Sequence, residues 1–395
     1  MKRLFLLISK SRYLFILILL LTMFLEICFS QNPLYSNNEK IKIYYTKDDS
    51  NTYSFYADNF TFWPYYIKLK FTELLNMKAN VNLPFTKTLK PNELKQYLFT
   101  IKGIKSKAYK YSYTYNYYNS NPNAKHNDSY LYLFPFEHGF KHPVGQGYNG
   151  SFSHKDKLRY SVDFDMKEGT QIVAARGGTV VDVKDDSNVG GPSESYKKDG
   201  NYISIIHDDG SYANYIHLRK NGSLVKPGNN VKPGDIIGYS GNTGWSSGPH
   251  LHFHVAKGSG ETIPVKFLNY NGKAVSVREG LWYYSYHTGK KHFKVILGHK
   301  LKNSTYKNYK ETTETDNKFS IETERIDDTY IFFAKNGYNK EKTLTLNFTV
   351  FENITSSKSV PLIANIPANS KIFLLLIRKK NSLEKWKFNY RYSYK

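Results

Sequence analysis

Three histidines at alternating positions, His250, His252 and His254, are the residues of this chain whose type and spacing could do chemistry. Successive side chains of an extended strand point to opposite faces, so the three imidazoles would share one face and the apolar residues between them the other. Imidazole is the commonest protein ligand for metals such as zinc. The glycine-rich segment 241–249 precedes them and lets backbone approach a ligand closely. The pattern predicts a metal site beside a substrate cleft.

The N-terminal segment predicts an exported protein. Basic residues precede an apolar run from Leu14 to Leu25, which is shorter than the ~20 residues of a membrane span and typical of a signal peptide. We expect residues 1–30 to be removed by cleavage before Gln31, with a retained anchor as the alternative. The mature chain would then be secreted, periplasmic or held in the cell envelope, with no permanent membrane span. Because Cys28 is the only cysteine, a zinc site would have to use histidines and carboxylates.

The chain carries a formal charge of +23, from 56 Lys and Arg against 33 Asp and Glu. One interpretation is a lysine-rich solvated surface. The other is attraction to a polyanion such as nucleic acid, an anionic membrane or an acidic envelope polymer. Zinc-finger spacing, RNA-recognition signatures and helix-turn-helix patterns are absent from the sequence, so we expect no nucleic-acid partner. Nothing in the sequence indicates the oligomeric state.

Two segments far apart in the chain match each other at a fixed offset of 277 residues. The matches include Ala57 with Ala334, Asn59 with Asn336, Asn76 with Asn353, Pro84 with Pro361 and Asn92 with Asn369. Both segments have alternating runs broken by Asn and Pro turns, which predicts small β-sandwiches of immunoglobulin-like type. We therefore expect an N-terminal module over residues 31–125 and its repeat over 318–395. Chance similarity between two Tyr- and Lys-rich stretches is the alternative.

Between these modules, glycines and short strand-like runs predict a compact all-β domain over residues 126–270, followed by an extension over 271–317. No long amphipathic pattern interrupts it. The expected fold is all-β: a central antiparallel sheet that forms a groove, flanked by two small β-sandwich modules.

The middle segment resembles the lysostaphin-like (LytM-type) zinc metallopeptidases, which cut peptide bonds in bacterial peptidoglycan. The resemblance covers about 110 residues and rests on an ordered series of short stretches: 150–154, 160–164, 168–170, 174–180, 200–201, 215–218, 232–235 and 248–252. Each stretch alone is a weak signal, and their order makes the series specific.

The resemblance implies that His154, Asp163 and His252 bind one zinc ion and that His217 and His250 flank a metal-bound water. Three protein ligands leave one tetrahedral position open, where zinc would polarise the scissile carbonyl and lower the pKa of water towards 7. A histidine that does not bind the metal could take the water proton, and another could stabilise the oxyanion. We expect His250 to be the general base and His217 the oxyanion stabiliser, with these roles reversible.

Two positions depart from the family pattern. Relatives commonly place the first ligands as His-x-x-x-Asp, yet Arg159 lies four residues before Asp163, and arginine cannot bind zinc. His154 would have to reach the metal through a connection with five extra residues. His254 replaces a frequent Glu and is expected to be a further polar contact instead of a ligand. Trp245, in the loop before the histidines, could stack on substrate or pack internally.

These features predict a secreted zinc endopeptidase that hydrolyses peptide cross-links of peptidoglycan. Its partners would be wall peptides or another anionic envelope polymer, on which the cationic chain would concentrate. The alternative is a non-catalytic scaffold of the same fold that binds or activates another wall hydrolase. A peptidase for secreted proteins is a third possibility, since substrate choice depends on groove loops.

Overall fold

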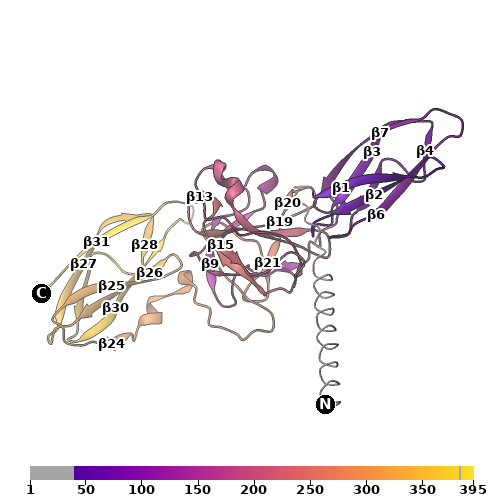
Figure 1. Ribbon diagram of the computed structural model, residues 1–395. Helices are drawn as coiled ribbons and strands as arrows, with labels where there is room; N and C mark the ends of the chain where they lie inside the picture. The colour runs from indigo at the N-terminus through magenta and orange to yellow at the C-terminus, as the bar shows by residue number, and fades with distance from the viewer. Residues whose placement is uncertain (1–39, 382–383) are drawn as a thin grey trace, which may run out of the picture. The chain divides into compact units, whose positions relative to one another are not determined.

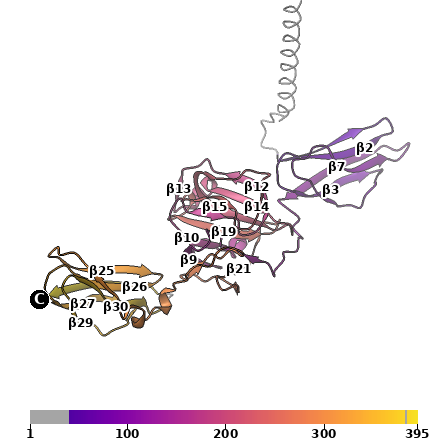
Figure 2. The same cartoon turned by 90° about the horizontal axis from the view of Figure 1, so that it is seen from below.

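The computed structural model describes residues 40–381 and 384–395, and these residues form an almost entirely β protein, as the sequence predicts (Figure 1, Figure 2). Helical structure among them is limited to four short 3-10 helices: η1 (Asp156–Leu158), η2 (Glu194–Asp199), η3 (Gly298–Lys300) and η4 (Asn303–Tyr306). No helix of the described part has the length and hydropathy needed to cross a membrane. The expected signal peptide and its cleavage before Gln31 lie outside the described residues.

The N-terminal part contains seven strands in two sheets. One sheet has the order β1 (Ile41–Lys47), β2 (Thr52–Asn59), β6 (Gln96–Gly103) and β4 (Met77–Ala79), and the other has the order β5 (Phe85–Thr88), β3 (Tyr66–Leu75) and β7 (Lys110–Tyr118). Every second residue of β2 is buried, as expected for a strand with one face on a core. Phe55 of β2 packs against Phe99 of its own sheet and Phe71 of the other, so the two sheets face each other as a sandwich.

The C-terminal part has the same strand order. One sheet contains β25 (Phe319–Ile326), β26 (Thr329–Asn336), β30 (Ser370–Lys379), β28 (Ile354–Ser356) and the additional β24 (Lys310–Thr312). The other has the order β29 (Leu362–Ile366), β27 (Lys342–Glu352) and β31 (Lys387–Tyr394). Its core includes Phe332, Leu344 and Leu375, all fully buried.

Corresponding positions in the two sandwiches share local structure as well as residue type. β26 begins and ends 277 residues after β2, and β28 does so after β4. The side chain of Asn59 donates to the carbonyls of Trp63 and Lys90, and that of Asn336 donates to those of Lys340 and Pro367 at the same offsets. We infer that the two sandwiches are copies of one module. In each copy, the buried asparagine links two separate segments through hydrogen bonds to their backbone carbonyls.

The central part is built on a large sheet whose main path, antiparallel throughout, runs β16 (Asn230–Val231), β12 (Gly178–Lys184), β14 (Asn201–Ile206), β15 (Tyr212–Ser223), β19 (His250–Ala256), β10 (Val162–Asp165), β9 (Lys141–Gln146) and β23 (Trp282–Tyr284). Off this path, β11 (Gln171–Val173), β17 (Ile236–Ser240) and β20 (Thr262–Ile263) extend it. Smaller pairings join β13 (Gly190–Gly191) to β18 (Gly244–Trp245), and β8 (Leu131–Tyr132) and β22 (Ala274–Val275) to β21 (Lys266–Leu268).

One face of the central sheet carries a hydrophobic core. Phe134, Phe164 and Phe267 are fully buried there, and the rings of Phe134 and Phe267 stack with their centroids 4.8 Å apart. Burying a phenylalanine side chain contributes roughly 1.5–3 kcal/mol. Leu251 and Phe253 of β19 point into this core, which forces the alternating histidines of the same strand to the opposite face.

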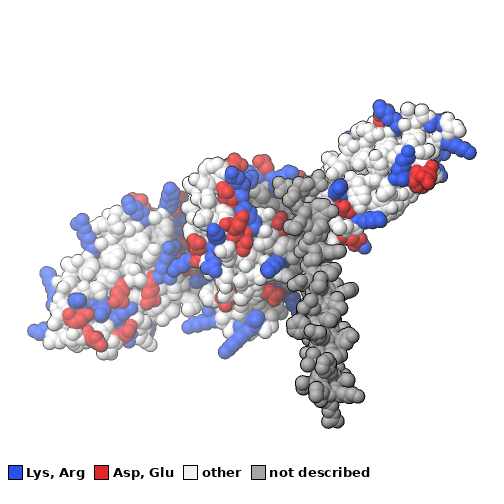
Figure 3. All heavy atoms as spheres, in the orientation of Figure 1, with Lys and Arg blue, Asp and Glu red and all other residues white. Residues whose placement is uncertain are grey.

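Basic side chains of the described residues are dispersed on the face drawn in Figure 3. On the face drawn in Figure 3, Lys and Arg side chains are spread over the described parts and alternate with Asp and Glu. The formal excess of +23 is therefore not gathered into one compact patch on this face.

The shared asparagine gives a test of the module's stability. Replacing Asn336 by Ala leaves the carbonyls of Lys340, Ile366 and Pro367 without their donor, which should destabilise the module by about 1–3 kcal/mol. Amide hydrogen exchange in β26 and β30, measured by mass spectrometry, should become roughly 5- to 150-fold faster. The exposed Asn347 of β27 is the matched control, and equal exchange in both alanine variants would contradict the role of Asn336.

Candidate metal centre

The central strand β19 is paired on both sides, and these pairings determine what faces its histidines. His252 lies opposite Asp163 of β10 on one side and Ile216 of β15 on the other. His252 and His254 are each only 6% exposed. A carboxylate is therefore fixed beside the middle histidine by backbone pairing alone.

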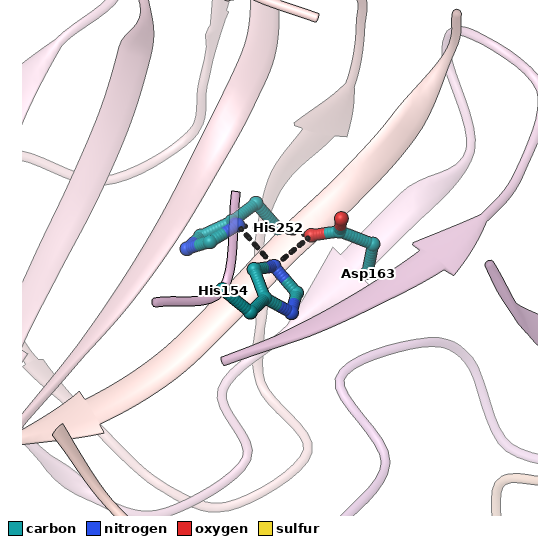
Figure 4. Close-up of side chains that lie close together, drawn as sticks. All are labelled: His154, Asp163 and His252. Atoms are coloured by element: carbon teal, nitrogen blue, oxygen red, sulfur yellow. Dashed lines mark hydrogen bonds and ion pairs between the residues drawn. The ribbon is translucent and has the colours of Figure 1, made fainter. Parts of the chain in front are cut away.

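Three side chains converge at this point: His154, Asp163 and His252 (Figure 4). The Oδ1 atom of Asp163 lies 3.1 Å from Nε2 of His154 and 2.9 Å from Nδ1 of His252, and the two nitrogens are 3.4 Å apart. Ligand atoms around a tetrahedral zinc, at roughly 2.0–2.1 Å from the ion, are separated by about 3.3 Å. All three residues are buried, and the spacing of their atoms fits such an ion.

The hydrogen bonds of His154 also fit a cation. Its Nδ1–H donates to the carbonyl oxygen of Gly147 over 2.8 Å. A neutral imidazole has a single N–H, so Nε2 presents a lone pair towards the carboxylate of Asp163. Two electron-pair donors that face each other at 3.1 Å repel unless a cation or a proton lies between them. The bond to Gly147 thereby holds the tautomer that a metal ligand requires.

Asp163 is held by Gln146, a residue that the sequence did not single out. The Nε2–H group of Gln146 donates to Oδ2 of Asp163 over 2.9 Å, which leaves Oδ1 for the histidines. Burial raises the pKa of the Asp163 carboxyl, but with a proton in the place of the cation the hydrogen bonds from His154 and His252 outweigh burial and hold that pKa well below its usual value. A lone glutamine at a strand end carries no sequence signal, because only the pairing of β9 with β10 reveals its partner.

The longer connection before Asp163 brings in His154 and leaves Arg159 outside. The Oε1 atom of Gln146 accepts hydrogen bonds from the backbone N–H groups of Phe152 and Ser153, which anchors the segment just before His154. His154 is fully buried, whereas Arg159 is exposed and lies over the ring of Tyr160.

His217 and His250 lie beside this cluster. Their ring centroids are 4.6 Å apart, and Nε2 of His250 is 3.8 Å from Oδ1 of Asp163. Each Nδ1–H donates to a backbone carbonyl, that of His217 to Thr243 over 2.6 Å and that of His250 to Gly248 over 2.8 Å. Both imidazoles can therefore keep an unprotonated Nε2.

The backbone of His217 adopts a left-handed conformation, with φ of 68°. The register between β14 and β15 shifts at this point, which indicates a β-bulge, and bulges commonly re-aim a side chain next to a functional site. A left-handed conformation in a residue other than glycine costs about 1–3 kcal/mol and persists where surrounding structure over-determines it. Burial, together with the neighbouring His250 and His252, lowers the pKa of His217 to about 3.

A cavity of about 460 Å³ opens onto the cluster and is lined by residues that include Phe152, Asp163, Gly248, His250 and Glu279. The half-exposed Phe152 packs against Trp245, with ring centroids 5.5 Å apart, and Trp245 donates its indole N–H to the carbonyl of Pro192. Trp245 thus packs within the wall of the groove and supports the aromatic ring that lines the cavity.

Comparison with known proteins finds similarity in the part of the chain that contains most of these residues. Residues 157–265 match the model of peptidase family M23, a range that contains Asp163, His217, His250 and His252 and begins three residues after His154. Lysostaphin of Staphylococcus staphylolyticus is 42% identical over 112 residues, which are 28% of this chain and 20% of that protein. Glycyl-glycine endopeptidase ALE-1 of Staphylococcus capitis is 43% identical over 95 residues, 24% of this chain and 23% of that protein.

A peptidoglycan DD-endopeptidase of Vibrio cholerae, ShyA, is 38% identical over 93 residues, 24% of this chain and 19% of that protein. Among solved structures, the catalytic domain of lysostaphin from Staphylococcus simulans aligns with 32% of this chain and 87% of that chain, at 32% identity and a TM-score of 0.24. The matched region spans about a fifth of the length of the curated relatives. The central part of this chain thus contains a stretch, residues 157–265, that matches peptidase family M23.

Proposed function

We propose that this chain is a zinc-dependent endopeptidase that hydrolyses peptide cross-links of bacterial peptidoglycan. The observation that carries the proposal is the convergence of three buried ligand atoms, from His154, Asp163 and His252, beside two further imidazoles, of which His250 lines a cavity together with Asp163. A scaffold without activity would have no need of His217 and His250, so their position favours the enzyme.

The ligand set suits zinc because it combines two imidazole nitrogens with one carboxylate oxygen and contains no thiolate. When bound there, zinc would polarise the scissile carbonyl and make water a stronger nucleophile at neutral pH. Gln146 and Gly147 would keep the ligands in place, because each fixes the atom of Asp163 or His154 that does not face the ion.

His250 and His217 would handle the proton. His250, whose Nδ1–H is committed to Gly248, offers Nε2 to take a proton from the attacking water and deliver it to the leaving amine. His217 would stabilise the oxyanion only while its Nε2 carries a proton, because its Nδ1–H is committed to Thr243. The pKa of His217, lowered to about 3, keeps this imidazole neutral at neutral pH, so the proton on Nε2 would come from the other tautomer, which gives up the hydrogen bond from Nδ1 to Thr243.

We infer the substrate class from the names of the relatives. The names of the relatives specify glycyl-glycine bonds in one case and DD-endopeptidase activity on peptidoglycan in another. We assign wall peptides in general to this chain, and digestion of purified peptidoglycan, with mass spectrometry of the released fragments, identifies the bond. The charge of +23 would concentrate the chain on an anionic envelope, and the two sandwich modules would position the peptidase domain there.

Ligand assignment is tested by the metal content of the full mature chain. We expect about one zinc per wild-type chain, with loss of metal and of wall hydrolysis in His154→Ala and His252→Ala, because each removes a ligand atom. Arg159→Ala, which changes only an exposed side chain, is the matched control and should keep both. Metal retained in His154→Ala would overturn the role of His154 as a ligand. Loss of metal in Arg159→Ala would show that position 159, four residues before Asp163, contributes to the site as in the family pattern.

The proton-handling roles are tested by variants that keep the metal. His250→Ala should retain zinc yet lower the rate of wall hydrolysis by roughly 10²–10⁴-fold, the usual contribution of a general base. His217→Ala should also retain zinc and lose activity. His299→Ala, which changes an exposed histidine, is the matched control and should keep both zinc and activity. A His250→Ala variant with wild-type activity would exclude this residue as the base.

The aromatic wall of the cavity is tested by Phe152→Ala. We expect a rise in KM of roughly tenfold with little change in kcat, because the ring lines the cavity without reaching the ligand cluster. Leu224→Ala, another exposed apolar truncation in the same domain, should leave both constants unchanged. A fall in kcat alone would show that Phe152 acts on the chemical step instead of on binding.

A further inference from the structure

A row of polar side chains leads away from the metal centre across three neighbouring strands. Ser204 of β14 lies directly opposite Asn214 of β15, and Asn214 lies directly opposite His254 of β19. The Oγ atom of Ser204 is 2.6 Å from Oδ1 of Asn214. The Nδ2 atom of the same amide is 2.9 Å from Nε2 of His254. The Nδ1 atom of His254 is 3.0 Å from Nε2 of His252. The row is therefore continuous up to a metal ligand.

His254 has no ligand atom in the converging cluster, and yet it is buried and both of its nitrogens are engaged. His252 presents Nδ1 to Asp163 and to the metal position. A metal on Nδ1 obliges the proton of this imidazole to sit on Nε2, which makes Nε2–H the donor and Nδ1 of His254 the acceptor. The proton of His254 must then sit on its own Nε2 and point at Asn214.

That arrangement requires the oxygen of the Asn214 amide to face His254. The oxygen and nitrogen of an amide are nearly isosteric and are distinguished by their hydrogen-bond network. With the amide turned, its NH₂ group donates to Ser204, and every link of the row keeps a donor and an acceptor. With the amide in the opposite sense, Asn214 donates to Nε2 of His254, and the row ends with Nδ1–H of His252 donating to Asp163. Each imidazole keeps one proton, so the two arrangements differ in polarity and not in charge.

We propose that His254 is a positioning residue which, together with Asn214, selects the tautomer in which His252 offers Nδ1 to the metal. The inference rests on the proposed metal centre and deepens it. Groups that hold the second nitrogen of a ligating histidine typically change metal affinity by 10–100-fold when they are mutated. In this chain, the group that binds the second nitrogen of His252 is His254. The tautomer of His254 depends in turn on the orientation of the Asn214 side-chain amide.

The test measures zinc affinity of the full mature chain by competition with a chromophoric chelator, without substrate. His254→Leu removes the acceptor and should weaken zinc binding roughly 10–100-fold, whereas His254→Gln keeps an acceptor oxygen and should restore affinity to within a few fold. The visible absorption of the cobalt-loaded chain should change in His254→Leu and return in His254→Gln. Equal affinity of His254→Leu and wild type would overturn the proposal.

A second pair of variants decides the matter even where His254→Leu fails to fold. Asp at position 214 can only accept hydrogen bonds, so Asn214→Asp holds the polarity that suits the metal and should bind zinc at least as well as wild type. Asn214→Leu should bind it more weakly. Thermal unfolding of the metal-free chains verifies the fold, and equal weakening in both Asn214 variants would overturn the proposal.

The outcome also separates this inference from the proposed function. A wild-type chain that binds no zinc would overturn the metal centre and the role of His254 with it. A wild-type chain that binds zinc but hydrolyses no wall peptide would overturn the enzyme, while the affinities of the variants still decide the role of His254.

Discussion

The backbone pairing of β10 with β19 is the constraint on which the rest of the metal centre depends. This pairing places Asp163 directly opposite His252. Because side chains alternate between the two faces of a strand, His252 and His254 lie on the same face. A slip of one residue would turn the histidines into the hydrophobic core and bring Leu251 and Phe253 to the groove. The core on the other face therefore specifies the register, because Leu251 and Phe253 are fully or almost fully buried.

The same pairing explains how a polar cluster can be tolerated inside a sheet. Burying unpaired imidazoles and a carboxylate is unfavourable unless each polar atom has a partner. Here almost every such atom away from the converging point is already satisfied, Oδ2 of Asp163 by Gln146 and Nδ1 of His154 by Gly147. What remains is a set of lone pairs aimed at one position, and this arrangement suits a cation better than it suits an empty site.

The sequence was informative where side-chain order alone determines geometry. Strand alternation indicated that His250 and His252 share a face, and short runs between turns indicated an all-β chain. It was less informative where geometry depends on contacts between distant segments. The inward course of the loop at His154 depends on Gln146, and the direction of His217 depends on a bulge with φ of 68°. Neither leaves a local pattern, and the row from His254 to Ser204 depends on the pairing of three strands.

Gln146 has a consequence for how such a protein can be changed. One amide group holds the carboxylate of Asp163 with its nitrogen and the backbone N–H groups of Phe152 and Ser153 with its oxygen. The cavity wall at Phe152 and the carboxylate proposed to bind the ion are thus connected through a single side chain. Grafting a different loop into this segment to alter selectivity would disturb the electrostatic setting of Asp163 as well. The segment at Phe152 and Gln146 would therefore have to be exchanged together, because replacing the segment alone removes the hydrogen bonds that Gln146 accepts from it.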